Sequence, residues 1–298
     1  MNKAADLEGL LKSSVVSVLQ STIHYSSSGE GDPMVFVHGM PTSSFLWRKI
    51  MPALSTQARC IAPDLIGMGK SGKPQIEYSL SDHIDYFEAF MKKMSLRNVT
   101  LVLHGWGSVI GFEYARRNPD CVKAIAFYEA HVRAAVDRSM LSLPVQQLLS
   151  LVDNAPDGRD AVIEKNHMIH RLLPACAVDS LPSSVLKEYE RPFLTRESRE
   201  VFWQYLLELP KGKESVAVDT IHRYSNWLTQ SGIPKLMLYA VPGFVTTMDT
   251  VVWAKQSIKN LTLESLENVM HLAPETQPDE FASKLESWYL SSVKRRGI

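Results

Sequence analysis

The chain has 298 residues, 45% of them hydrophobic, and its 32 Lys and Arg side chains balance 32 Asp and Glu side chains. This length, without an internal linker rich in Gly, Ser or Pro, predicts one large domain with an insertion rather than two independent domains. The balanced charge argues against a nucleic-acid-binding surface or an acidic tail, so we expect a small organic partner and neither nucleic acid nor membrane.

Cysteine usage and apolar stretches bear on the cellular compartment. The chain has three cysteines, Cys60, Cys121 and Cys176, an odd number without paired spacing. This predicts reduced thiols rather than a disulfide framework or a zinc site. Asp6 and Glu8 precede any apolar run, and no apolar stretch reaches membrane-spanning length, so neither a signal peptide nor a transmembrane helix is expected. We expect a cytoplasmic protein without a metal or other cofactor.

The first half of the chain alternates between predicted strands and helices. Two short strands, 15–20 and 22–25, are followed by turn residues and predict a hairpin at a sheet edge. The apolar runs 34–37 and 60–64 predict strands buried on both faces, with a helix capped at 42–44 and running through about residue 54 between them. The alternation continues with a helix over 81–94, a strand over 99–104, a helix over 109–117 and a strand over 122–129.

From residue 130 to about 213 the alternation gives way to helical segments rich in Leu, Met and His and interrupted by prolines. This change predicts a helical cap inserted after the sixth strand, with a core domain over 1–130 and 214–298 and the cap over 131–213. Strands and helices alternate again over 235–240, 247–259, 261–266 and 278–293. The predicted fold is a mostly parallel, doubly wound α/β sheet, whose ligands bind beyond the carboxyl ends of the strands.

The segment from Leu101 to Ser108 predicts a buried strand that enters a tight turn and then a helix. In an α/β hydrolase this arrangement is the nucleophile elbow, where one strained position projects its side chain above the sheet. That position is Gly105, which has no side chain to attack with. Ser108 lies three residues into the helix, so we expect it to pack or cap, and His104 is expected to point back into the sheet.

Several segments, in order and in spacing, resemble haloalkane dehalogenases. They are HGMPTSSFLWR at 38–48, DLIGMG at 64–69, WGS at 106–108, YEA at 128–130, RPFL at 191–194 and PDE at 278–280. The resemblance runs from about Thr22 to Leu290. It implies an α/β-hydrolase fold, and it implies the subfamily whose catalytic acid follows the strand after the elbow.

The resemblance also implies roles for the matching positions. Family members displace halide with an aspartate at the position of Gly105, and a histidine held by a carboxylate then activates water to hydrolyse the alkyl-enzyme ester. His271 and Glu129 occupy the positions of that histidine and carboxylate. The leaving halide is bound by an indole N–H at Trp106 and by an asparagine at the position of Met40. This chain therefore lacks the nucleophile, and the Met40 thioether cannot donate a hydrogen bond.

The groups that remain still support proton transfer. The backbone N–H groups of Met40 and Trp106 are expected to form an oxyanion hole, and His131 is expected to face the substrate pocket beside both residues. The leading hypothesis is non-covalent acid–base chemistry by His271 and Glu129, of lyase, isomerase or cyclase type, on a small apolar substrate. A residual hydrolase using water activated by His271, and a ligand-binding pseudoenzyme without turnover, are the alternatives. A conventional haloalkane dehalogenase is the least expected option.

Overall fold

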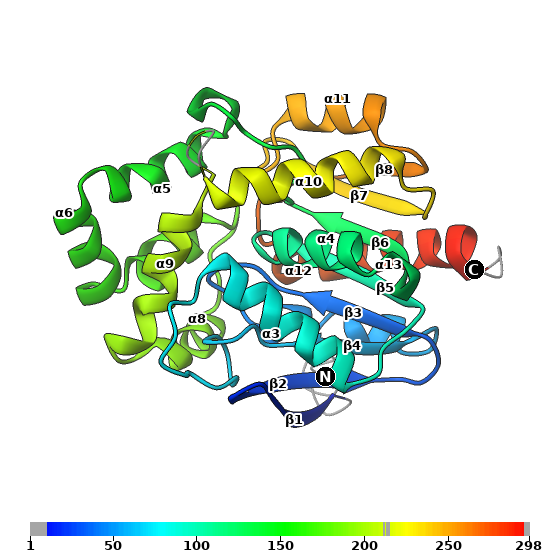
Figure 1. Ribbon diagram of the computed structural model, residues 1–298, viewed down its shortest axis with the longest axis horizontal. Helices are drawn as coiled ribbons and strands as arrows, with labels where there is room; N and C mark the ends of the chain where they lie inside the picture. The colour runs from blue at the N-terminus through cyan, green and yellow to red at the C-terminus, as the bar shows by residue number, and fades with distance from the viewer. Residues whose placement is uncertain (1–10, 211, 213–214, 295–298) are drawn as a thin grey trace.

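An eight-stranded sheet crosses the computed structural model, which describes residues 11–210, 212 and 215–294 (Figure 1). The strands are Lys12–Val18 (β1), Ser21–Ser28 (β2), Pro33–Val37 (β3), Arg59–Pro63 (β4), Val99–His104 (β5), Val122–Tyr128 (β6), Lys235–Ala240 (β7) and Leu261–Leu266 (β8). Their order is β1-β2-β4-β3-β5-β6-β7-β8. β2 pairs antiparallel with β1 and β4, and the remaining pairs are parallel. The predicted mostly parallel sheet with an edge hairpin is confirmed.

Helices cover the sheet and form a further group beside it. The α-helices are Met51–Leu54 (α2), Leu80–Lys93 (α3), Gly107–Arg117 (α4), Leu143–Asp153 (α5), Ala155–Arg159 (α6), Leu173–Ala175 (α7), Ser183–Glu190 (α8), Glu200–Glu208 (α9), Val216–Gln230 (α10), Met248–Ser257 (α11), Ala273–Thr276 (α12) and Pro278–Trp288 (α13). In Figure 1, α3, α4 and α10 lie in front of the sheet, and α12 and α13 lie behind it. This layering is that of a doubly wound α/β sheet, as predicted.

The prediction of one continuous helix, capped at 42–44 and running through about residue 54, is wrong. The chain forms a 3₁₀ turn over Ser44–Trp47, capped by the Ser43 side chain, and then the separate short helix α2. Pro52 occupies the first turn of α2. A proline cannot donate the backbone hydrogen bond that a continuous helix needs there, so the chain begins a new helix instead.

Most of the described residues from 138 to 208, between β6 and α10, form helical segments, as predicted for the residues after the sixth strand. In Figure 1, α5, α6, α8 and α9 lie to the left of the sheet and its covering helices. The division into a core over 1–130 and 214–298 and a cap over 131–213 stays a prediction. Its boundaries at 1, 213, 214 and 298 lie outside the described residues.

A buried carboxylate joins α8 to the segment between β3 and β4. Both Oε atoms of Glu275, in α12, lie 2.6 Å from the guanidinium nitrogens of Arg48. Lys49 Nζ donates to Glu275 Oε1 at 2.9 Å, and the Tyr189 hydroxyl of α8 donates to Oε2 at 3.1 Å. Burial alone would raise the pKa of Glu275, but the hydrogen bonds and charges of Arg48 and Lys49 hold it below its usual value. Glu275 is therefore a charged anchor between α8 and the loop that precedes α2.

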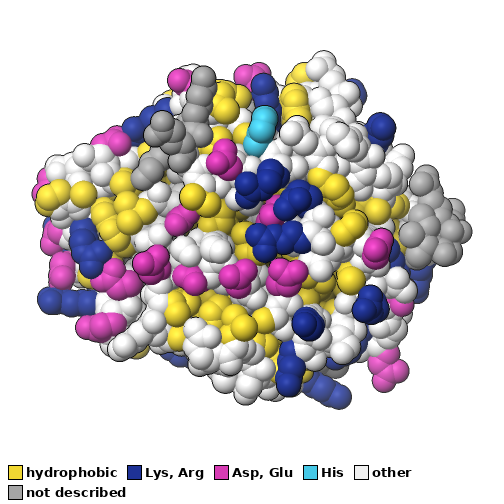
Figure 2. All heavy atoms as spheres, viewed as in Figure 1, with side chains coloured by type: hydrophobic (Ala, Val, Ile, Leu, Met, Phe, Trp, Pro, Cys, Tyr) yellow, Lys and Arg dark blue, Asp and Glu magenta, His cyan; other side chains and the backbone are white. Residues whose placement is uncertain are grey.

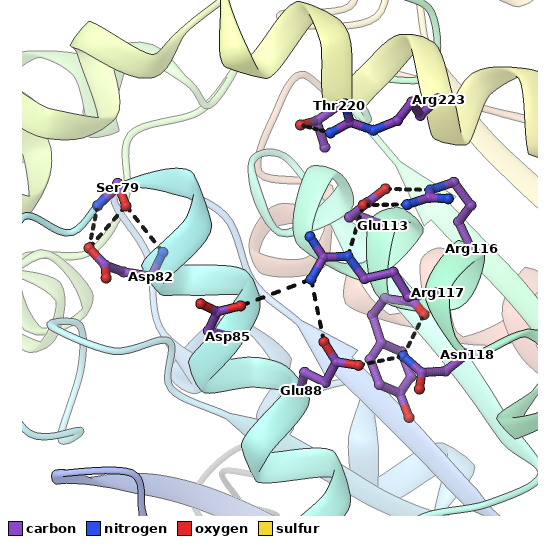
Figure 3. Close-up of polar contacts among 11 residues, drawn as sticks. Ser79, Asp82, Asp85, Glu88, Glu113, Arg116, Arg117, Asn118, Thr220 and Arg223 are labelled. Atoms are coloured by element: carbon purple, nitrogen blue, oxygen red, sulfur yellow. Dashed lines mark hydrogen bonds and ion pairs between the residues drawn. The ribbon is translucent and has the colours of Figure 1, made fainter.

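Lys and Arg side chains gather near the centre of the face in Figure 2, with Asp and Glu side chains around them. Figure 3 shows the contacts of Arg116 and Arg117, the two arginines of α4. The buried Glu113 carboxylate accepts from Arg116 Nε at 2.8 Å and from Arg117 Nε at 2.9 Å. Arg117 also reaches Glu88 of α3 at 3.5 Å. These contacts connect α3 to α4, the helix that follows the elbow.

Two further observations concern the cysteines and the apolar character of the helices. All three cysteines are free thiols, and burial raises the pKa of Cys60 to about 12, which makes it unreactive at neutral pH. Among the described residues, no helix combines the length and the apolar character needed to cross a membrane.

His83, on the buried face of α3, carries a prediction for stability. It is 2% exposed, and within the described part of the chain neither ring nitrogen has a hydrogen-bond partner. A buried polar group without a partner costs about 1–3 kcal/mol. We therefore expect His83→Leu to raise the melting temperature, with His222→Leu, at an exposed position of α10, as the matched control.

The same variant should change the pH dependence of stability. Burial lowers the pKa of His83 to about 4 from 6.5. The unfolded chain therefore binds a proton between these pH values while the folded chain does not, so His83 destabilises the fold as the pH falls from about 6.5 to 4. Denaturant unfolding of His83→Leu should show a smaller loss of stability over this window. An equal loss in both proteins would contradict the assignment.

Candidate active site

The elbow between β5 and α4 has Gly105 at its apex. This residue has φ +52°, in the left-handed region that a side chain disfavours. The Ser108 hydroxyl donates to the Gly105 carbonyl at 2.6 Å and accepts from the backbone N–H of His131 at 2.9 Å. Ser108 thus fastens the elbow to the segment after β6, in keeping with the capping role expected for it, and does not project as a nucleophile.

His271 and Glu129 meet although 142 residues separate them in the chain. His271 Nδ1 lies 3.1 Å from Glu129 Oε2, and the two residues are 4% and 1% exposed. The same carboxylate oxygen accepts the backbone N–H groups of Phe244 at 2.8 Å and Val245 at 2.6 Å. These donors hold the carboxylate in place, and a carboxylate facing Nδ1 fixes the proton there. Nε2 is then the basic atom of the ring.

His104 supports the loop that carries His271, a role that its position before the elbow did not reveal. Its Nε2 lies 2.8 Å from the backbone carbonyl oxygen of His271, and the two rings are 4.4 Å apart between centroids. A carbonyl oxygen only accepts, so His104 Nε2 carries the proton. Burial lowers the pKa of His104 well below 6.5, which keeps this ring neutral. Tyr128, the last residue of β6, donates its hydroxyl to the carbonyl of Met270, so two hydrogen bonds hold this loop.

The apex of the elbow faces the basic edge of His271. A Cβ atom placed on Gly105 would lie 3.3 Å from both Nε2 and Cε1 of His271, and 3.5 Å from Gly39 Cα. Among the described residues, His271 Nε2 makes no hydrogen bond. The ring edge is therefore directed at the position where a side chain of residue 105 would begin.

The loop after β3 lies against the elbow. A Cβ atom on Gly39 would lie only 2.9 Å from the backbone nitrogen of Trp106, so this approach requires glycine. Within the described residues, neither Met40 N nor Trp106 N donates a hydrogen bond. Both N–H groups are thus available to a ligand, and the start of α4 adds its favourable potential for negative charge.

Trp106 is enclosed by side chains from the segment after β6 and from α9. The His131 ring packs edge-on against it at 5.6 Å, and Tyr205 of α9 does so at 5.2 Å. Burial, and then the nearby charge of His271, lower the pKa of His131 to about 4, so its ring is neutral at pH 7. His131 Nε2 has no partner in the part of the chain described. Tyr205 was not predicted, because the sequence of residues 131–213 contains few recognisable motifs.

Taken together, these groups can transfer a proton. Nε2 of a carboxylate-held imidazole is the base, and the N–H groups of Met40 and Trp106 are donors for a developing negative charge. The structure brings Gly105, His271 and Glu129 together, and it brings His131 against Trp106. Each role assigned to these residues remains a prediction.

Comparison with known proteins agrees with this architecture. The family described as alpha/beta hydrolase fold matches residues 32–278. A haloalkane dehalogenase of Agrobacterium fabrum is 37% identical over 89% of this chain and 88% of its own length. A haloalkane dehalogenase of Sphingobium indicum is 37% identical over 75% of this chain and 77% of its own.

Solved structures give the same result. The haloalkane dehalogenase DatA from Agrobacterium tumefaciens superposes with a TM-score of 0.88 at 36% identity, covering 93% of this chain and 96% of that chain. The haloalkane dehalogenase DbeA from Bradyrhizobium elkani gives a TM-score of 0.90 at 29% identity, covering 93% and 97%. The chain therefore belongs to the haloalkane dehalogenase family of α/β hydrolases.

Proposed function

We propose that this family member hydrolyses a small apolar substrate without forming a covalent enzyme intermediate. His271, held by Glu129, removes a proton from water, and the resulting hydroxide attacks the substrate directly. The observation that carries this proposal is the position of the base at the elbow: an ideal Cβ on residue 105 would lie only 3.3 Å from His271 Nε2, and residue 105 has no side chain. Water at the position of that missing side chain lies within reach of the base.

The substrate class follows from the groups around that space. Trp106 and Tyr205 offer aromatic surface, and Met40 offers a buried thioether. Among the described residues the Trp106 indole N–H makes no hydrogen bond, so it is free to stabilise a leaving anion. The relatives named haloalkane dehalogenases support a halogenated alkane as the electrophile. Met40 cannot supply the second donor, so we propose substrates whose leaving group departs readily, such as bromoalkanes.

Other reaction classes would use the same proton-transfer pair. Elimination, isomerisation and ring closure need a base at His271 but no water, and the names of the relatives give these reactions no support. We therefore place hydrolysis first. A cytoplasmic location is part of the same proposal and rests on the three free thiols.

The test is product analysis with short 1-bromoalkanes. The unmodified protein should release bromide and the matching alcohol in equal amounts, above the rate in buffer. An alkene in place of the alcohol would identify elimination and overturn the hydrolytic assignment. Saturable binding of the bromoalkanes without any bromide release would identify a ligand-binding protein.

A further inference from the structure

A cavity of about 460 Å³ lies between the β1–β2 hairpin, the loop after β4 and the end of α8. In Figure 1, β1 and β2 lie at the bottom of the molecule, and α8 lies at its lower left. Its lining includes Ser13, His24, Asp64, Lys70 and Arg191. The residues of the candidate active site do not line it, so it is a separate space. Its volume falls within the range of about 300–1,000 Å³ typical of small-molecule sites.

Three of the lining residues form a chain of hydrogen bonds. Ser13 Oγ, on β1, lies 2.8 Å from Nε2 of His24 on β2. His24 Nδ1 lies 2.8 Å from Oδ2 of Asp64, the residue after β4. This is the order of groups found in serine hydrolases: a hydroxyl, an imidazole and a carboxylate joined through opposite nitrogens of the ring.

The proton positions on these three side chains suit nucleophilic attack by the Ser13 hydroxyl. Burial alone would raise the pKa of Asp64, but the hydrogen bond from His24 and nearby imidazole charges hold it below its usual value. The carboxylate is therefore ionised and only accepts, so His24 Nδ1 carries the proton of the hydrogen bond to Asp64. Nε2 is then the acceptor of the Ser13 hydroxyl proton.

The base is rigidly held, whereas the hydroxyl is accessible. Asp64 also accepts the backbone N–H groups of Ser44 at 2.6 Å and Lys70 at 2.8 Å. The backbone N–H of His24 donates to Ser71 Oγ at 3.0 Å. His24 and Asp64 are buried, while Ser13 is an exposed residue of the edge strand β1. A fixed base beside an accessible hydroxyl is the requirement for an activated serine.

Positive charge lines the same cavity. Lys70 lies in the loop beside Asp64, and Arg191 follows α8. Arg191 is paired with Glu188, and the Asp64 carboxylate is satisfied by His24 and the backbone. Arg48 also lines the cavity and is paired with Glu275, so Lys70 is the lining cation to which we assign the stabilisation of negative charge on a substrate oxygen.

We propose that Ser13, His24 and Asp64 form a second hydrolytic site, for small carboxylic esters. Ser13 Oγ bonds to the ester carbonyl carbon while His24 Nε2 takes the hydroxyl proton. The bond from that carbon to the alcohol oxygen then breaks, and the departing alcohol receives the proton from His24. Water, deprotonated by His24, attacks the acyl carbon and breaks its bond to Oγ. His24 returns the proton to Oγ, which restores Ser13 and releases the carboxylic acid.

The experiment uses p-nitrophenyl acetate with the unmodified protein, Ser13→Ala and Ser17→Ala. Ser17 lies on the same strand and the same face as Ser13, is exposed and does not line the cavity, so it is the matched control. We expect Ser13→Ala to lose at least about tenfold of the hydrolysis rate, because general-base-assisted attack contributes roughly 10²–10⁴-fold. Ser17→Ala should keep the full rate.

Covalent labelling separates this site from the one at His271. Diisopropyl fluorophosphate should add one adduct to the unmodified protein, and peptide mapping should place it on Ser13. Equal hydrolysis by Ser13→Ala and Ser17→Ala, an adduct at another residue, or no hydrolysis and no adduct would each overturn the proposal. The bromide assay is independent of these readouts, so failure of one site leaves the other untouched.

Discussion

Replacing His271 with alanine should lower the rate of bromide release by about 10²–10⁴-fold, the usual contribution of a positioned general base. The reason is geometric: Nε2 is the basic atom that faces the open apex at Gly105, and Nδ1 is engaged by Glu129. The measurement is kcat for a 1-bromoalkane. The effect should fall mainly on kcat, because the imidazole acts on water in the transition state rather than in substrate binding.

Two further variants show whether the loss of activity is specific to His271 and to its partner Glu129. His222→Ala, at an exposed position of α10, should turn over as the unmodified protein does. Glu129→Gln keeps an oxygen for the N–H groups of Phe244 and Val245 but removes the charge that orients His271. It should therefore also lose activity. Bromide release that persists in His271→Ala would contradict the role of this histidine.

Replacing Gly105 with aspartate should create a covalent alkyl-enzyme ester with the same bromoalkanes. The new carboxylate would project from the elbow apex beside the ring of His271, where an ideal Cβ already lies 3.3 Å from Nε2. Intact-mass analysis after an acid quench should show the mass of one alkyl group added to Gly105→Asp. The unmodified protein should show no addition, because it has no carboxylate at that position.

Gly105→Asn is the matched control for formation of the alkyl-enzyme ester by Gly105→Asp. It has nearly the same shape and the same backbone strain at φ +52°, but its amide is not a comparable nucleophile. Both variants should lose about 1 kcal/mol of stability, because a side chain in the left-handed region is disfavoured, although Asp and Asn tolerate it better than most. A folded Gly105→Asp protein that forms no adduct would show that the apex is not aimed at the substrate carbon.

The sequence predicts the sheet well where strands are buried on both faces. The expected strands 99–104 and 235–240 coincide with β5 and β7, since each is a mainly apolar and largely buried run. The expected strand 261–266 also coincides with β8, although this edge strand mixes polar and apolar residues and is only partly buried. The helix expected up to residue 54 fails because Pro52 interrupts it, an effect that apolar periodicity alone does not report. The strand expected over 15–20 ends instead at Val18, where the chain turns through Leu19 with a positive φ of 48°.

In the candidate active site, too, sequence reasoning finds some of the residues and misses others. Residues near the elbow and at strand ends are accessible to sequence reasoning, because parallel strands bring their carboxyl ends to one edge of the sheet. Other contacts arise only from tertiary packing between residues far apart in the sequence. They are the hydrogen bond between His104 and the carbonyl of His271 and the contact of Tyr205 with Trp106. The Ser13–His24–Asp64 chain is likewise invisible in sequence, because it depends on the pairing of β2 with both β1 and β4.

The origin of the product oxygen tests the non-covalent mechanism most directly. With enzyme in excess over a 1-bromoalkane in ¹⁸O-labelled water, a single turnover should place ¹⁸O in the alcohol, because hydroxide formed at His271 attacks the substrate carbon. Gly105→Asp should instead release unlabelled alcohol, whose oxygen comes from the carboxylate. Unlabelled alcohol from the unmodified protein would mean that another carboxylate of the chain attacks the substrate, and would contradict the account.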